Sequence, residues 1–161
     1  GEWWLIAQLT VIAAHLMPPW PNLLYRQISW PIGIKAIGML LFTMGLIMAV
    51  KALLNLGTSL SPLPDPKPGA SLVRDGSYLK CRHPLYQALL IASAGITTYL
   101  GSAFHVMLLI ILTILLKGKA KREERKLCQI HSDYKEYISE TPAIIKGFAF
   151  LDWRNPDNYY N

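Results

Sequence analysis

The chain has 161 residues, of which 52% are hydrophobic, and its formal net charge is +6. This length is short for two domains, and a mean hydropathy of +0.27 is too apolar for an ordinary soluble domain. The apolar residues form long blocks rather than a narrow helical stripe, which is typical of membrane helices. Cys81 and Cys128 form neither a disulfide framework nor a CxxC pattern, and no His/Cys/Asp cluster has metal-ligand spacing.

The first predicted membrane span covers residues 3–17 and ends at Pro18-Pro19. Such a helix measures roughly 22 Å, less than the ~30 Å of a hydrocarbon core, so we expect a short span. A signal peptide is the alternative, which the absence of a basic N-terminal region disfavours. The chain begins with Gly1 rather than Met, so we expect a trimmed N-terminus.

The second predicted span, residues 31–56, is the clearest. Its charged residues, Lys35 and Lys51, lie close enough to the helix ends to reach the membrane surface. Gly57 follows as a C-cap that ends the helix. Small residues predict close packing of this helix against a neighbour, and they are Gly33, Gly38 and Gly45.

A proline-rich loop, residues 58–83, follows the second span. Prolines at every second position from 62 to 68 predict a stiff, non-helical segment. The loop leads into the stretch RDGSYLKCRHPLY (74–86), which crowds polar and basic side chains against the start of an apolar helix. Such crowding indicates a functional site. The loop therefore either links two spans or covers a bound ligand.

Two further spans are predicted at 84–100 and 103–116. The short Gly101-Ser102 joint between them predicts an antiparallel helical hairpin. Between Ala103 and Glu140, Gly118 is the only helix breaker in the sequence. We therefore expect the fourth helix to leave the membrane and to continue as a cytosolic helix over 117–140.

Charge predicts the orientation of the chain in the membrane. Basic residues concentrate at 67–82 and 117–126, which favours a cytoplasmic membrane surface and argues against a nucleic-acid partner. With four spans, both termini then lie in the cytoplasm. The predicted fold class is all-α: a polytopic membrane helix bundle of about four transmembrane helices in a single domain, 1–161. Its last helix extends into the cytoplasm, and its C-terminal tail, 143–161, lies along the interface.

This topology brings polar side chains from distant segments to one membrane face. Hydrogen-bond donors and carboxylates together suit a zwitterion such as an amino-acid group. The apolar helices offer a route for a lipid tail. The sequence therefore predicts a site that joins an amino-acid-bearing cofactor to a lipophilic substrate. The polar groups are Tyr78 to Tyr86, Glu123 with Glu124, and Tyr134 with Tyr137, the last two expected to pack the helix onto the loop.

Three stretches carry a family resemblance. The segment LVRDGSYLKCRHPLY resembles the Gly-x-Tyr and Arg-His-Pro-x-Tyr signature of the isoprenylcysteine carboxyl methyltransferase and phospholipid methyltransferase superfamily. The segment REERKLCQIHSDYKEYISETP is similar to that superfamily's Glu-Glu, Tyr-x-x-Tyr and Pro ending. Leu56-Gly57, followed by Ser59 and Ser61, resembles its Leu-Gly-x-x-x-Ser element. The resemblance covers roughly Leu56 to Pro142.

The resemblance implies an integral membrane methyltransferase that uses S-adenosylmethionine and encloses this cofactor on the cytosolic side. Its substrate would be a lipid or a prenylated molecule. The resemblance implies cofactor contacts from Tyr78, His83, Pro84, Leu85, Tyr86, Glu123 and Glu124. The candidate catalytic residues are Arg82, Glu123 and Arg122.

The chain departs from the superfamily pattern at several positions. Ala88 stands where many members have Gly, Ile130-His131 replaces a Phe-Gly pair, and the Glu-Glu pair lies about one residue out of register. The usual Arg after the final Pro is absent. Basic residues that could replace it in orienting an anionic substrate are Arg122, Arg125 and Lys146.

Plainer interpretations of the same residues stay open. Arg82 alone would serve as a head-group anchor, and Tyr78 and Tyr86 as interface aromatics. The Glu-Glu pair would form a solvated charge lattice with Lys119 and Lys121. Cys81 is expected to be an inert thiol.

The resemblance leaves several acceptors and functions open. We expect an isoprenylcysteine carboxylate as methyl acceptor, with a phospholipid amine or a small thiol as alternatives. Two alternatives come from other classes: an NADPH-dependent membrane reductase, for which the chain is short, and a non-catalytic lipid-binding membrane protein. The sequence predicts no oligomeric state.

Overall fold

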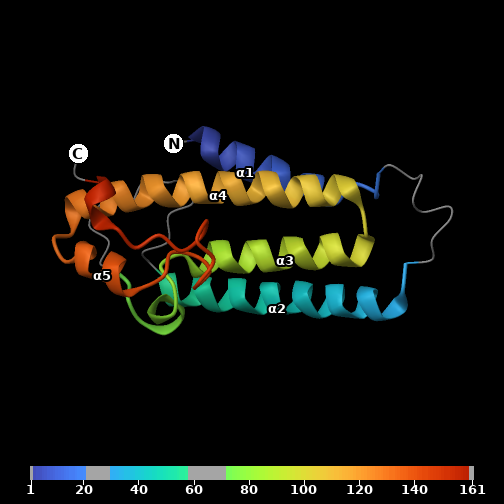
Figure 1. Ribbon diagram of the computed structural model, residues 1–161, viewed down its shortest axis with the longest axis horizontal. Coiled ribbons are helices and arrows are strands. Elements are labelled where there is room, and N and C mark those ends of the chain that lie inside the picture. The colour runs from blue at the N-terminus through green and yellow to red at the C-terminus, as the bar shows by residue number, and fades with distance from the viewer. Residues whose placement is uncertain (1, 21–29, 58–71, 160–161) are drawn as a thin grey trace.

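The computed structural model describes residues 2–20, 30–57 and 72–159 of the chain. All regular structure in these ranges is helical, as predicted (Figure 1). The α-helices are α1 (Glu2–Ala14), α2 (Ile32–Leu56), α3 (Pro84–Leu100), α4 (Ala103–Ile130) and α5 (Tyr134–Glu140). Short 3-10 helices lie at η2 (Gly76–Leu79) and η3 (Pro156–Tyr159). Most of the proline-rich loop, residues 58–71, lies outside the described ranges.

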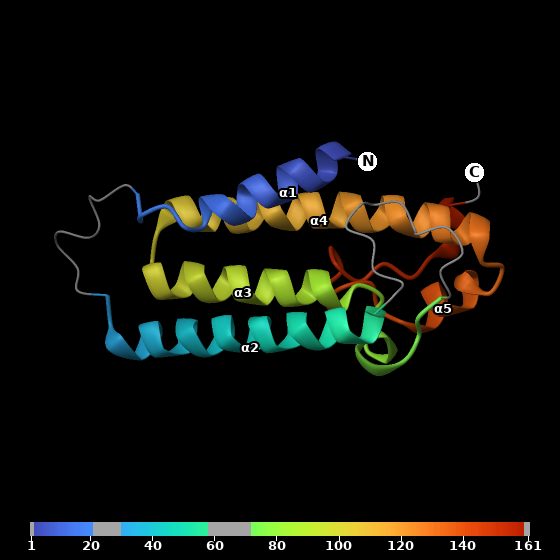
Figure 2. The ribbon, with the colours of Figure 1, turned by 180° about the vertical axis from the view of Figure 1, so that it is seen from behind.

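The four longer helices lie side by side, with α2, α3 and α4 running in alternating directions (Figures 1 and 2). α1 lies along α4 on the side away from α2. The end of α2, the start of α3, the end of α4, α5 and the C-terminal tail gather at one end of the bundle, hereafter the polar end. The predicted hairpin of 84–100 and 103–116 is confirmed, with Gly101 in the left-handed conformation at the joint.

α2 and α3 approach each other closely because glycines remove the side chains between them. A Cβ built on Gly45 would lie 2.6 Å from the backbone nitrogen of Ala92. One built on Gly38 would lie 2.5 Å from that of Tyr99, and Gly95 of α3 meets Phe42 in the same way. The prediction of close packing is thus confirmed for Gly38 and Gly45, where no side chain would fit. Gly33 has open space around it.

Two of the described helices, α2 and α4, are long and apolar enough to cross a membrane. α2 exposes apolar side chains along its outer face, and Ile32, Leu40 and Leu54 are each more than two-thirds exposed. Such a surface suits contact with lipid. α1 and α3 are shorter and pack beside these two helices. The prediction of about four membrane spans is therefore supported for α2 and α4, and stays a prediction for α1 and α3.

A histidine fixes the end of α1 against the rest of the bundle. His15 follows α1 directly, and its Nε2 lies 2.6 Å from the hydroxyl oxygen of Ser93 in α3. Its carbonyl oxygen lies 3.3 Å from Nε2 of His105 in α4. All three side chains are buried, so these polar contacts join three helices within an apolar bundle.

The predicted continuous cytosolic helix over 117–140 is wrong. α4 ends at Ile130, His131 adopts extended backbone angles (φ −118°, ψ 111°), and α5 begins at Tyr134. The break turns α5 back, so that the fully buried Ile138 contacts the polar end of the bundle. Tertiary packing here overrides helix propensity, aided by Ser and Asp at 132 and 133, which compete for backbone hydrogen bonds.

Candidate functional site

The Arg-His-Pro segment is held by the C-terminal tail. The backbone N–H of Arg82 donates to the carbonyl of Pro142, and that of His83 donates to the carbonyl of Ala143, both at 2.9 Å. Pro84 then begins α3, where its missing N–H costs no helical hydrogen bond. The tail therefore forms part of the site, which the sequence did not predict.

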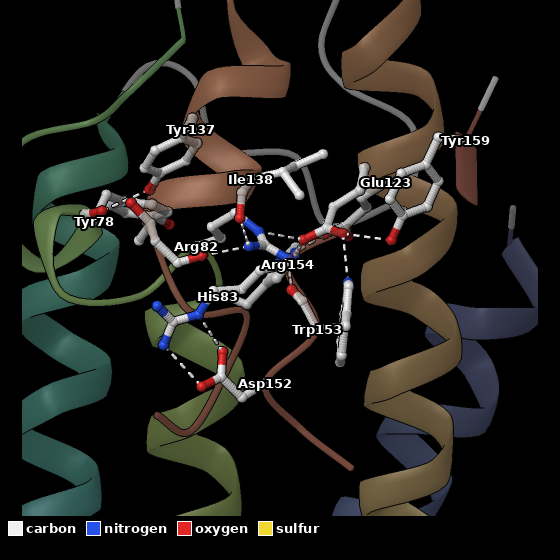
Figure 3. A network of polar contacts seen from close by, with 12 residues as sticks. Tyr78, Arg82, His83, Glu123, Tyr137, Ile138, Asp152, Trp153, Arg154 and Tyr159 are labelled. Atoms are coloured by element: carbon white, nitrogen blue, oxygen red, sulfur yellow. Dashed lines mark hydrogen bonds and ion pairs between the residues drawn. The ribbon is translucent and has the colours of Figure 1, made fainter. Parts of the chain in front are cut away.

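Arg82 is the centre of a buried network (Figure 3). Its side chain has no exposed area, and its Nε lies 2.7 Å from Oε1 of Glu124. Its Nη1 donates to the carbonyl oxygens of Ile138 and Thr141, and its Nη2 donates to that of Trp153. Arg82 thus joins α4, α5 and the tail. The interpretation of Arg82 as a lipid head-group anchor is wrong, because such an anchor must be exposed.

Glu124 receives hydrogen bonds from four side chains. Besides Arg82, its Oε1 lies 2.9 Å from Nε2 of His83. Its Oε2 accepts from Nε1 of Trp153 at 2.7 Å and from the hydroxyl of Tyr159 at 2.6 Å. These contacts favour the ionised carboxylate. Glu124 is completely buried, so the interpretation of this residue as part of a solvated charge lattice is wrong.

Glu123 has a different environment. Its side chain is 18% exposed, and its Oε1 accepts a hydrogen bond from the hydroxyl of Tyr86. Its Oε2 lies 3.6 Å from Nδ1 of His83, beyond ordinary hydrogen-bond distance. The rings of His83 and Tyr86 are stacked, with centroids 5.3 Å apart. Glu123 therefore retains accessible acceptor capacity beside two aromatic rings.

The tyrosines of the site are buried rather than placed in an interface belt. Tyr86 is 6% exposed and Tyr78 is 9% exposed, so the interface interpretation is wrong for both. The hydroxyl of Tyr137 donates to the carbonyl of Tyr78 at 2.5 Å, which confirms that Tyr137 packs α5 onto the loop. Tyr134 is also buried and edge-on to Tyr137.

Burial keeps the hydroxyl of Tyr78 and the thiol of Cys81 neutral. It raises the pKa of the Tyr78 hydroxyl to about 12, with a smaller contribution from the negative charge of Glu123. It raises the pKa of the Cys81 thiol to about 11, partly offset by a backbone hydrogen bond and by Arg82. A buried thiol with a raised pKa is a poor nucleophile, in agreement with the expectation that Cys81 is inert.

The structure brings together most, but not all, of the sequence-predicted residues. Arg82, His83, Tyr86, Glu123 and Glu124 form one connected cluster. Pro84 and Leu85 form the first turn of α3 beside it. The basic residues suggested as replacements for the missing Arg are all exposed: Arg122, Arg125 and Lys146.

Two residues of the site are not predicted by the sequence. It predicts an interfacial tail over 143–161 and assigns no site role to Trp153 or Tyr159, yet both donate to Glu124. A clue was available in the tail itself, because Trp and Tyr usually find a hydrogen-bond partner when they are buried. Ala88, where many members of the superfamily have Gly, is fully buried, and its backbone lies against Gly45 in the contact between α2 and α3.

The residues present suit a cofactor with an amino-acid end. A carboxylate with spare acceptor capacity, Glu123, matches an ammonium group, and stacked rings offer a surface for an apolar or cationic group. Glu124 is satisfied by its protein partners and fits better as the fixed support of this arrangement. In the part of the chain that the structure describes, no group of His, Cys, Asp and Glu side chains could hold a metal ion.

Comparisons with known proteins agree with the resemblance. Searches of curated proteins and of solved structures give no significant match. The family model of the phospholipid methyltransferases matches residues 34–134, which is more than half of the chain and includes α3, α4 and the whole connected cluster. The chain therefore belongs to the phospholipid methyltransferase family, within the superfamily of isoprenylcysteine and phospholipid membrane methyltransferases.

Proposed function

We propose that this protein is an integral membrane enzyme that transfers a methyl group from S-adenosylmethionine to the amine of a phospholipid. Membership of the phospholipid methyltransferase family supports methyl transfer to a lipid-related substrate. The observation that carries the proposal is the connected cluster of Arg82, His83, Tyr86, Glu123 and Glu124 at the polar end of two apolar helices.

The proposed cofactor contacts come from the start of α3 and the end of α4. We assign them to Tyr78, His83, Pro84, Leu85, Tyr86, Glu123 and Glu124. Bound S-adenosylmethionine supplies an activated methyl group on a positively charged sulfur. Glu123 would bind its ammonium group, while Glu124 would act through His83, to which it is hydrogen-bonded.

The chain's own residues would position the acceptor and exclude water. Methyl transfer is an in-line displacement, which depends on alignment and on a dry environment. A phospholipid ammonium must lose a proton before it attacks, and Glu123 and His83 are the groups placed to accept it. Arg82 would be a positioning residue, because its hydrogen bonds hold Glu124, α5 and the tail. Arg122, which is exposed, would attract the anionic group of the substrate at the surface, before the substrate enters the site.

An isoprenylcysteine carboxylate is the second candidate acceptor. The Arg82-His83-Pro84 element with Tyr86, and the Tyr134-x-x-Tyr137 element, are compatible with it because both resemble the signature of the superfamily that includes the isoprenylcysteine methyltransferases. A carboxylate is already a nucleophile and needs no general base. Binding of the cofactor by Glu123 would matter for both acceptors, so the two differ only in how strongly kcat depends on Glu123 at saturating S-adenosylmethionine.

We further propose that the active site faces the cytoplasm and that both termini lie on that side. The basic residues at 72–82 and 117–126 belong to the polar end of the bundle, which supports this orientation under the positive-inside rule. Cysteine accessibility in sealed vesicles would test it: a thiol introduced at exposed Glu140 should react only with a reagent that reaches the cytoplasmic side.

The experiment that tests the function uses purified protein in detergent. Calorimetry should detect binding of S-adenosylhomocysteine, and radiolabelled methyl transfer should be measured to phosphatidylethanolamine, to N-acetyl-S-farnesylcysteine and to a small thiol. At saturating S-adenosylmethionine, Glu123→Gln should lower kcat for phosphatidylethanolamine by roughly 10²-fold or more, as expected for loss of a general base. The matched control is Glu140→Gln, an exposed glutamate of α5, which should behave as the wild type.

Several outcomes would overturn the proposal. Absence of binding together with a response to NADPH would favour a membrane reductase. Absence of both, with lipid still bound, would favour a non-catalytic lipid-binding protein. Methylation of N-acetyl-S-farnesylcysteine alone would transfer the assignment to a carboxylate acceptor.

A further inference from the structure

α4 carries lysines at three alternate positions, and they have different environments. The ammonium of Lys117 lies 3.4 Å from the ring centroid of Phe150, and that of Lys121 lies 5.7 Å from the ring of Trp153. Both therefore point toward the C-terminal tail. Lys119, between them in sequence, is only 4% exposed and points into the bundle. Two of the three ammonium groups thus lie at the tail, and the third lies inside the bundle.

The contacts of Lys119 connect it to the candidate site. Its Nζ lies 3.0 Å from Oε1 of Gln8 in α1, and 5.4 Å from the centroid of the Tyr86 ring. Tyr86 in turn donates to Glu123, which follows Lys119 by one helical turn. Lys119 is therefore a buried cation on the α1 side of the Tyr86–Glu123 pair. Burial of an ammonium is unfavourable unless polar or anionic groups compensate it, and here the amide of Gln8, the face of the Tyr86 ring and the negative charge of Glu123 do so.

α1 closes the bundle beside Lys119. Gln8 is nearly buried, and Trp4, one turn earlier, lies against Gly118 of α4, where an added Cβ would come within 2.6 Å of the Trp4 ring. α1 precedes the residues matched by the family model, 34–134. The contact between Gln8 and Lys119 is therefore a feature that family membership does not explain.

Lys119 also lies where the sequence of α4 changes from apolar to charged. The preceding turns of α4 are apolar, with Leu112 and Leu116 buried, and the following turns carry the charged run that ends at Lys126. Such a change from apolar to charged residues marks the boundary between hydrocarbon and head groups. A phosphate beside Lys119 would offer the ammonium an anionic acceptor, which binds a cation more strongly than the neutral amide of Gln8 does.

We infer that Lys119, held in place by Gln8, binds the phosphate group of the phospholipid acceptor. This inference rests on the proposed function and names the group that positions its substrate. The ethanolamine arm that joins phosphate to amine is two carbons long. A phosphate at Lys119 therefore places the amine beside Tyr86 and Glu123, where the proton acceptor lies.

The test compares lysines within one helix. Initial rates are measured in mixed micelles with increasing phosphatidylethanolamine for the wild type, Lys119→Gln, Lys119→Arg and Gln8→Ala, with Lys117→Gln and Lys121→Gln as matched controls. Lys119→Gln should raise KM for phosphatidylethanolamine about tenfold or more, as expected for a lost charge-assisted hydrogen bond. Affinity for S-adenosylhomocysteine should stay within about twofold of the wild type. Lys119→Arg should recover most of the KM, Gln8→Ala should raise it less, and the two controls should leave it unchanged.

A binding measurement separates this inference from the proposed function. Thermal unfolding is followed with a short-chain phosphatidylethanolamine, with inorganic phosphate and with N-acetyl-S-farnesylcysteine, without turnover. Phosphatidylethanolamine should stabilise the wild type and Lys119→Arg but not Lys119→Gln, whereas the other two probes should give no shift that depends on Lys119. Equal responses of Lys119→Gln and the wild type, or a response to inorganic phosphate alone, would overturn the inference. If S-adenosylhomocysteine fails to bind while the lipid shift depends on Lys119, the proposed function fails and the lipid site stands.

Discussion

α2 and α3 meet backbone to backbone through Gly38, Gly45 and Gly95, whereas α3, α4 and the tail meet through the buried charges of Arg82 and Glu124. The first contact depends on shape alone, because nothing larger than hydrogen fits between the helices. The second depends on complete pairing, because a buried charge that loses its partner is costly. The scaffold and the site of this protein should therefore respond differently to substitution.

The largest effect is expected from Arg82→Met. This change leaves the Glu124 carboxylate buried without its cation and removes the contacts to α5 and the tail, which should cost about 3–5 kcal/mol of stability. Denaturant and thermal unfolding in detergent measure the loss. The control is Arg122→Met, an exposed arginine of the same chain, which should change stability by about 0.5 kcal/mol or less.

A double variant sharpens this prediction. Adding Glu124→Gln to Arg82→Met removes the uncompensated charge, so the two substitutions together should cost less than the sum of their separate effects. If the losses of stability simply add, Arg82 and Glu124 do not stabilise each other. The proposed difference between this ion pair and the glycine contact would then be wrong.

The second-largest change in stability is expected from substitutions in α2, and its sign differs between two glycines of this helix. Gly45→Ala places a methyl group 2.6 Å from the backbone of Ala92, which cannot move aside as a side chain can. We expect a loss of about 1–3 kcal/mol from overpacking. Gly33→Ala, with open space around its Cβ, should instead stabilise α2 by up to about 1 kcal/mol. Equal melting temperatures for the two variants would contradict a contact governed by shape.

A smaller effect is expected at Trp153. Replacement by Phe keeps the ring but removes one of the donors to Glu124, which retains Arg82, His83 and Tyr159. The expected cost is about 1–1.5 kcal/mol, and weaker binding of S-adenosylhomocysteine should accompany it. Phe148→Leu, at an exposed aromatic residue of the same tail, provides the control. A variant with unchanged stability and binding would show that the tail is not part of the site.

The sequence predicts the contact between α2 and α3 more completely than the network around Arg82 and Glu124, for physical reasons. The bounds of α3 follow from local chemistry at Pro84 and Gly101, and small residues on α2 indicate a close contact whatever the partner. The pairing of the Arg82–Tyr86 segment with Glu123 and Glu124 was expected from topology and resemblance. The helix break at His131 and the return of Trp153 and Tyr159 to Glu124 were not, because these features depend on contacts between segments far apart in the chain.

The thiol of Cys81, at the polar end of the bundle, can report on local opening. Its use changes neither the glycine contact between α2 and α3 nor the Arg82–Glu124 pair. Burial raises the pKa of Cys81 from its ordinary value of 9.0 to about 11, so roughly one thiol in a thousand is ionised at pH 8 in the folded protein. In a Cys128→Ala background, we expect maleimide to label folded protein very slowly at this pH. Because the pKa is higher in the folded state, the stabilisation that Cys81 contributes is present below pH 9 and is lost as the pH rises toward 11.

Labelling of Cys81 then shows whether the two regions open independently. Arg82→Met should accelerate labelling strongly, because it loosens the segment that buries Cys81. Gly45→Ala should leave the rate close to that of the wild type below its melting temperature, although it lowers global stability. Rapid labelling of Gly45→Ala under those conditions would mean that the glycine contact and the ion network unfold as one unit. The polar end would then be kept folded by the packing of α2 against α3 rather than by its own buried charges.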